Sequence, residues 1–136
     1  MFNISPPIQV HYNEIKELLN VGDVDNLTNE AIYNLIVKIP CFIMSLRDKQ
    51  IEALRKYKEA KLMYQKVSAE AFLSSDGKSV EVRKAAASLM QEVIDAEREL
   101  IDAEAEYERL KTMDSDWVEL QQALKKIIDG RIKKQV

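Results

Sequence analysis

Residues 72–84 read FLSSDGKSVEVRK, and this segment decides how the rest of the chain folds. It places Ser, Asp and Gly, which favour turns, between two long stretches of helical periodicity. Gly77 can adopt the positive φ that often follows a helix end. Ser79 is a candidate N-cap for the next helix, and Glu81 adds a favourable carboxylate to its first turn. Because the connection is short, it predicts that the two flanking helices are antiparallel neighbours.

The tripeptide Gly77-Lys78-Ser79 also matches the end of a phosphate-binding loop. That motif needs another glycine five positions before Gly77, where this chain has Phe72. It also needs a buried strand before the loop, whereas a helical pattern precedes it here. The sequence therefore favours a turn between helices over a nucleotide-binding loop.

Two apolar series flank the turn, and both step by four and three residues. The first alternates small and large side chains: Ala53, Tyr57, Ala60, Tyr64, Val67 and Ala71. The second continues in the same way: Val82, Ala86, Leu89, Val93, Ala96, Leu100, Ala103, Tyr107 and Leu110. A repeat sustained over this length is typical of helices packed as in a coiled coil. We therefore predict an all-α fold built on a long antiparallel, coiled-coil-like helical hairpin.

The N-terminal part predicts shorter helices. An apolar helical pattern begins after Pro6-Pro7 and ends near Gly22. Thr28 is a candidate cap for a second helix, which Pro40 should end or kink because proline lacks the backbone N–H and clashes with the preceding turn. The long helix of the hairpin then begins at Leu46.

The C-terminal part predicts one more helix. Thr112 to Asp116 reads as a turn in preference to a kink. Asp116 with Glu119 resembles a capping box for a helix from Trp117 onward, and Ser115 is an alternative cap. The predicted organisation is an N-terminal helical segment, 1–45, followed by the hairpin and the C-terminal helix, 46–136, in a single domain overall.

Composition excludes several classes of function. The 136 residues include one Cys and one His, so neither a disulfide framework nor a Cys/His zinc site is available. The carboxylates of 92–119 fall outside the inward positions of the apolar series, and no Glu-x-x-His is present. We expect no enzymatic activity, no metal and no cofactor. With no apolar run of about 18 residues and no leader pattern, we also expect no membrane partner and a cytoplasmic location.

Charge is distributed unevenly along the chain, although the net charge is only −3. Residues 47–66 hold seven Lys and Arg against three Asp and Glu, and residues 92–119 hold three against eleven. Residues 120–136 are basic again, with five Lys and Arg against one Asp. One interpretation is that complementary flanking charges orient the two helices of the hairpin. The other is that some of the basic residues bind phosphate groups.

The candidate phosphate-binding residues fall into groups. Lys56, Lys58, Lys61 and Lys66 belong to the helix before the turn. Lys78, Arg83 and Lys84 lie at the turn, beside a helix N-terminus that itself attracts anions. The tail forms a third group, which complements a helix C-terminus equally well: Lys125, Lys126, Arg131, Lys133 and Lys134.

Four features between residues 57 and 134 occur in the same order in a known family. They are a helix with repeated Ala and Tyr (57–64), an aromatic-ended turn with Ser, Asp and Gly (72–77), a charged Ala-rich helix (82–87) and a Trp-containing helix that ends basic (117–134). In this pattern the chain resembles the UvsY-type recombination mediators of tailed phages.

That resemblance implies a small oligomeric helical protein that binds single-stranded DNA, the phage recombinase and the single-strand-binding protein in the host cytoplasm. The expected function is that of a DNA recombination accessory protein that helps to load a recombinase. The residues expected to contact DNA are Lys58, Lys61, Lys66, Lys78, Arg83 and Lys84.

A homo-oligomer also follows from the residues themselves, because the narrow Ala and Tyr seams leave much apolar surface uncovered in a monomer. The alternative function is that of a structural or adaptor coiled-coil oligomer with no affinity for DNA.

Overall fold

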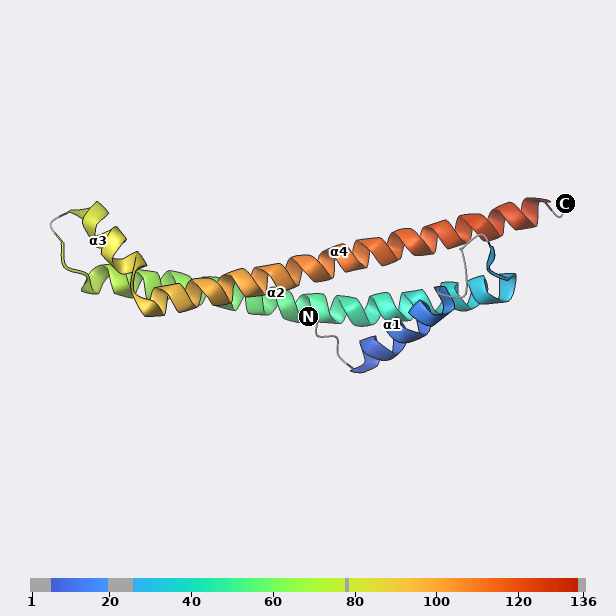
Figure 1. The fold of residues 1–136 in the computed structure, drawn as a ribbon, viewed down its shortest axis with the longest axis horizontal. Coiled ribbons are helices and arrows are strands. Elements are labelled where there is room, and N and C mark those ends of the chain that lie inside the picture. Colours follow the sequence, from blue (N-terminus) through green and yellow to red (C-terminus); the bar gives the residue numbers. More distant parts are fainter. Residues whose placement is uncertain (1–5, 20–25, 78, 135–136) are drawn as a thin grey trace. The chain divides into compact units, whose positions relative to one another are not determined.

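The computed structural model describes residues 6–19, 26–77 and 79–134, and these residues form four helices and no strand. The helices are α1 (Pro6–Leu19), α2 (Asn29–Ser74), α3 (Val80–Ser88) and α4 (Gln91–Lys134) (Figure 1). The long helices α2 and α4 pack against each other. The predicted all-α fold with a long helical hairpin is therefore confirmed. None of the described helices has a segment with the length and apolar character of a membrane span.

The two long helices contribute to two compact units. Unit 1 consists of Met1–Lys49 and Leu110–Val136, and unit 2 consists of Gln50–Arg109. The division expected from the sequence, 1–45 and 46–136, follows chain order, whereas unit 1 combines two segments that are distant in the chain. The expected end of the first helix near Gly22 lies outside the described residues.

Unit 1 is organised around three aromatic rings, one from each of its helices. The ring centroids of Phe42 from α2 and Trp117 from α4 are 5.0 Å apart, and Tyr12 from α1 lies 6.0 Å from Phe42 and 6.1 Å from Trp117. Tilted and edge-to-face arrangements at these distances are the favourable ones for aromatic pairs. Buried aliphatic residues complete this core: Ile15, Leu27, Ile32, Leu35, Ile39, Ile43, Leu46, Leu110, Leu124 and Ile128.

Polar contacts join the same helices at the surface of unit 1. Lys38 pairs with Glu14 of α1 at 2.9 Å, and Arg131 of α4 donates a hydrogen bond to the Asn29 side chain at 2.7 Å. Arg47 of α2 pairs with Asp114 of α4 at 3.0 Å, and this hydrogen bond and charge attraction raise the pKa of Arg47. Exposed pairs of this kind contribute less than about 1 kcal/mol each, so the buried core supplies most of the stability.

α2 begins with the cap that the sequence predicted, but it does not end at Pro40 as the sequence led us to expect. The Thr28 hydroxyl accepts a hydrogen bond from the Ala31 N–H at 3.2 Å, which confirms the predicted cap. Of the two outcomes expected at Pro40, the helix end is wrong, because α2 continues to Ser74. An interior proline costs about 3 kcal/mol. The fully buried Ile39 and Phe42 on either side each contribute about 1.5–3 kcal/mol, enough to offset that cost.

The turn predicted for residues 112–116 is also wrong, because α4 runs without interruption through this segment. Thr, Asp and Ser favour helix ends, but the segment contains neither Pro nor Gly to break the helix. Its neighbours are held in place on both sides, since Leu110 is buried and Trp117 belongs to the aromatic cluster. The expected capping residues Asp116 and Glu119 instead lie exposed in the middle of α4.

A break that the sequence did not predict separates α3 from α4. The apolar series predicts one helix from Val82 to Leu110, but α3 ends at Ser88 and α4 begins at Gln91. The Leu89 N–H donates to the Ala86 carbonyl and the Met90 N–H to the Ala87 carbonyl, and the Met90 carbonyl accepts from Val93 and Ile94. Leu89 and Val82 are both exposed, so neither joins the seam.

The packing in unit 2 gives the reason for this break. Ala71 at the end of α2, Ala87 of α3 and Val93 of α4 form one buried cluster. Tyr64, Val67, Phe72 and Met90 pack around it. Ala87 and Val93 can both pack on Ala71 only if the chain turns between them. The free energy gained by burying this cluster therefore outweighs the cost of interrupting the helix.

The rest of unit 2 follows the predicted seam. Ala53 of α2 and Ala96 of α4 are buried, and the rings of Tyr57 and Tyr107 lie 6.1 Å apart across the two helices. Small residues at regular positions let the helices approach, and the tyrosine rings fill the space between them. The seam is therefore confirmed from Val93 to Leu110, but not before Val93.

Replacing Phe42 by Ala should lower the free energy of unfolding by about 3–5 kcal/mol, because the cavity would lie where three rings meet. The matched control is Tyr33→Ala on the same helix, whose side chain is exposed. It should change stability by less than about 0.5 kcal/mol. Urea unfolding followed by far-ultraviolet circular dichroism measures both. Equal losses in the two variants would contradict the assignment of Phe42 to the core.

Candidate nucleic-acid interface

The predicted DNA-contacting residues before the turn all lie on α2 in unit 2. Lys58, Lys61 and Lys66 are exposed, and none of the three makes an ion pair or a hydrogen bond with another described residue. Arg55 is exposed and unpaired in the same way, although the sequence argument did not select it. Lys56 differs, because it approaches Glu52 at 3.9 Å. The structure thus places four unpaired cations on one segment of α2.

These cations alternate with apolar side chains. Arg55, Lys58, Leu62 and Lys66 follow one another at steps of three and four, so they share a side of the helix. At 3.6 residues per turn this side lies about 180° from the seam that contains Tyr57 and Tyr64. Leu62 is 66% exposed at its centre, and the exposed Ile51 lies at its N-terminal end. We call the side formed by Ile51, Arg55, Lys58, Leu62 and Lys66 the outer face of α2.

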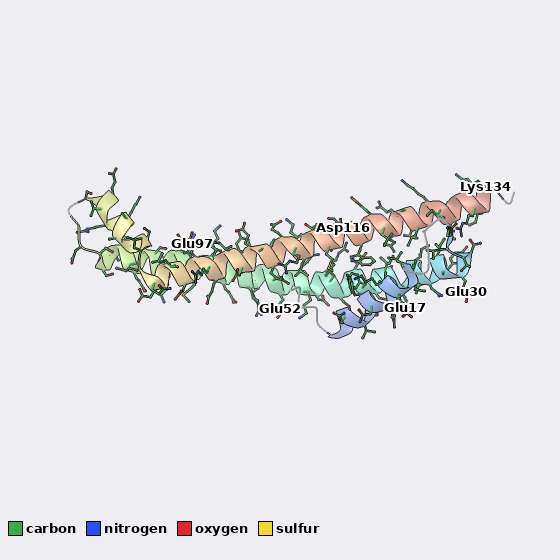
Figure 2. All side chains as sticks on the ribbon, viewed as in Figure 1. Glu17, Glu30, Glu52, Glu97, Asp116 and Lys134 are labelled. Carbon is green, nitrogen blue, oxygen red and sulfur yellow. The ribbon has the colours of Figure 1, made fainter. Side chains whose placement is uncertain are left out.

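Lys61 lies beside the outer face rather than on it, about one sixth of a turn from Lys58. From Arg55 to Lys66 the cations cover about 16 Å of helix at 1.5 Å per residue. Figure 2 shows the side chains of α2 and α4, with Glu52 and Glu97 labelled on the parts that belong to unit 2. This arrangement is suited to contacts with an extended anion.

The group at the turn is less well assembled than the sequence suggested. Lys78 lies outside the described residues. Arg83 turns back on its own loop, where its Nε donates to the Gly77 carbonyl at 3.1 Å. Lys84 is exposed on α3. The predicted cap is confirmed, since the Ser79 hydroxyl accepts from the Val82 N–H at 3.2 Å, and Glu81 lies in the first turn.

Gly77 is needed for space rather than for its backbone angle. Its φ does not lie in the left-handed region, so the expected positive φ is wrong. A Cβ at this position would approach the Val82 Cγ1 to 2.9 Å and the Arg83 Cγ to 3.2 Å. The end of α2 is closed by serines instead: the Ser74 and Ser75 hydroxyls both donate to the Ala71 carbonyl, at 3.2 and 2.6 Å.

Among the described residues, no ion pair joins Lys58, Lys61 or Lys66 of α2 to the acidic segment of α4. Glu97, Asp102 and Glu104 are exposed and make no ion pair with a described residue. An ion pair between the two charged segments, Arg47–Asp114, does form, but it lies in unit 1. Flanking charges therefore do not account for Lys58, Lys61 or Lys66.

The aromatic residues near the cations are packed against other side chains and are not placed to stack on bases. Proteins that hold single strands often stack bases on exposed rings. Tyr57 and Tyr64 lie in the seam, and Phe72 packs on the cluster around Ala71. The outer face of α2 contains no aromatic residue, so any contact with nucleic acid there is made mainly to phosphates.

No family model, curated protein or solved structure matches the chain. Within residues 6–19, 26–77 and 79–134, no group of three or more His, Cys, Asp and Glu side chains is placed to hold a metal ion.

Replacing Ser79 by Ala should destabilise α3 by about 1 kcal/mol, because the Val82 N–H loses its acceptor. Amide hydrogen exchange of residues 80–88 would rise by about fivefold for 1 kcal/mol. The control is Ser88→Ala at the other end of α3, where the hydroxyl only donates to the Ala85 carbonyl. Exchange that rises equally in both variants would argue against the capping role.

Proposed function

We propose that the protein is a non-enzymatic accessory protein of DNA recombination that binds single-stranded DNA through the cations of α2. The observation that supports this proposal is the set of exposed, unpaired side chains of Lys58, Lys61 and Lys66 in a chain of net charge −3. Cations that bind no carboxylate within the described part of the chain remain available to phosphate groups. Arg55 extends the set toward the start of unit 2.

The energetics of this surface predict binding that depends strongly on salt. Each phosphate contact on a single strand contributes about 0.7 to the slope of log affinity against log salt. Three lysine contacts therefore give a slope of about −2, which means modest affinity for one chain. Several copies on the same strand would raise the affinity through effective concentration without new contacts.

The finer assignment rests on the resemblance to UvsY-type mediators. It adds a recombinase and a single-strand-binding protein as partners, and the host cytoplasm as the place of action. In this proposal the protein helps to load the recombinase, and it does so without catalysis or a cofactor.

A structural or adaptor oligomer without DNA affinity is the second candidate. The observation that favours it is the apolar content of the outer face of α2, where Leu62 and Ile51 are exposed among the cations. Phosphate binding does not require such residues, whereas protein partners do. The two candidates differ in one property, since an adaptor binds no nucleic acid at any salt concentration.

The test is fluorescence anisotropy of a labelled single-stranded oligonucleotide at low and moderate salt. The variant Lys58→Ala, Lys61→Ala, Lys66→Ala should lose most of the binding, and its salt slope should fall by about 2. The control variant Lys125→Ala, Lys126→Ala, Lys133→Ala removes the same charge from a different part of the chain. It should retain binding within about twofold, because non-contacting surface charges are largely screened.

Two further outcomes decide what remains of the proposal. Loss of binding in an Arg83→Ala, Lys84→Ala variant, with the α2 variant unaffected, would move the contacts to α3. Absence of binding by the wild-type chain at low salt would overturn the DNA proposal and leave the adaptor.

A further inference from the structure

The part of α4 in unit 2 carries a surface that complements the outer face of α2. Ile101 is 56% exposed at its centre. Glu97 precedes it by four residues and Glu104 follows it by three, so all three share one side of α4. Both carboxylates are exposed, and neither pairs with a described residue. We call the side formed by Glu97, Ile101 and Glu104 the outer face of α4.

The two outer faces have the same layout with opposite charge. On α2, Leu62 lies between Lys58 and Lys66; on α4, Ile101 lies between Glu97 and Glu104. Each face therefore presents one large apolar side chain with a charged residue about one turn away on either side. Lysine meets no lysine and glutamate meets no glutamate if one face is laid on the other.

The two faces also lie at the same level of unit 2. Tyr57 lies across from Tyr107, and Ala71 packs with Val93 at the other end of the seam. Because the helices are antiparallel, each step forward along α2 matches one step back along α4. Leu62 is five residues beyond Tyr57 and Ile101 is six before Tyr107, so their levels coincide. By the same count Lys66 is level with Glu97 to within one residue, about 1.5 Å, and Lys58 with Glu104 to within two residues, about 3 Å.

Within one chain these residues cannot meet. The outer face of α2 points away from the seam that joins the two helices. On α4, Ile101 lies about 130° from the seam, and Glu97 and Glu104 lie about 70–90° from it, on one flank of the helix. Leu62 and Ile101 are accordingly more than half exposed. A second copy with its helices in the same direction, turned about the helix axis so that this flank of its α4 faces the first copy, brings its α4 against the first copy's α2 in antiparallel orientation. The levels then agree without any shift along the helices.

We propose that the outer face of α2 in one copy packs against the outer face of α4 in a second copy. Leu62 meets Ile101 of the second copy. Lys58 and Lys66 pair with Glu104 and Glu97 of the second copy on either side of that contact. Pairing of α2 with α2 would place lysines against lysines, and pairing of α4 with α4 would place glutamates against glutamates.

This interface is heterologous, because it joins two different faces of the same chain. Each copy that joins therefore leaves one free outer face of α2 and one of α4, so the contact repeats until a ring closes or a filament forms. The inference does not depend on DNA binding. Lys61 lies beside the interface, whereas Lys58 and Lys66 would contact both the carboxylates of the second copy and the phosphate groups of DNA. The expected assembly has more than two copies.

The experiment measures mass by light scattering after size-exclusion chromatography, at low salt and several protein concentrations. The wild-type chain should have a mass above that of two copies. Two charge reversals, Glu97→Lys with Glu104→Lys and Lys58→Glu with Lys66→Glu, should each lower the mass toward the 15.7 kDa of one chain. The chain with all four substitutions should assemble again, because its faces are complementary with the signs exchanged.

Controls separate the interface from general charge effects and from folding. Glu99→Lys with Asp102→Lys adds the same charge to exposed positions of α4 that lie outside its outer face, about 100° or more from Ile101, and it should keep the wild-type mass. Helix content by circular dichroism should be unchanged in every variant. Leu62→Ser should also lower the mass without altering net charge.

Three results would overturn the proposal: a wild-type chain that stays monomeric or stops at a dimer, a mass that neither charge reversal changes, or a folded quadruple variant that does not assemble. Measuring DNA binding by the Glu97→Lys, Glu104→Lys variant distinguishes failure of the proposed interface from failure of the proposed function. That variant retains Lys58, Lys61 and Lys66, so any contact with phosphate that one chain makes by itself is preserved.

Discussion

Close packing of small residues against large ones between α2 and α4 is the constraint on which unit 2 depends. Ala53, Ala71 and Ala96 are buried because they let the helices approach, and the rings of Tyr57 and Tyr107 fill the gap between them. A seam this narrow covers only one side of each helix. Many charged side chains outside it are left at the surface, and among the described residues Lys58, Lys61 and Lys66 of α2 and Glu97 and Glu104 of α4 pair with none.

The helices of unit 1 pack in a different way. There α1 adds a third helix, and large side chains replace the alanines: Phe42, Tyr12 and Trp117 meet at the centre. Three helices enclose a broader core than two, and among the described residues the largest fully buried side chains all lie in this unit. This core tolerates Pro40 within α2 and weak helix formers such as Asp114 within α4. Unit 2 buries mainly small side chains, and in its second half the predicted seam holds only from Val93 onward.

The sequence predicted what depends on periodicity and missed what depends on packing. The seam from Ala53 to Ala71, the Thr28 and Ser79 caps and the antiparallel pairing all follow from local spacing. The continuity of α4 through Asp114 and its interruption after Leu89 do not. At Asp114, weak helix formers remain helical because of neighbouring tertiary contacts, and at Leu89 good helix formers are broken by the cluster around Ala71. For the candidate site, the exposure of Lys58 follows from its distance from the seam, and the same count would have found Arg55. The bond from Arg83 to its own turn was not predictable, because it depends on the path of the loop.

Leu62 and Ile101 lie at the same height along the hairpin, and this restricts the insertions and deletions that unit 2 can accept. One residue inserted into α2 between Tyr57 and Ala71 turns everything beyond it by about 100°, which carries seam positions outward and outer-face positions inward. Tolerated length changes must therefore add whole structural periods, of about 7 or 11 residues, to α2 and to α4 together. Related chains that keep this hairpin should then differ in paired blocks, and single-residue gaps should gather at 75–79 and 89–90, between the helices.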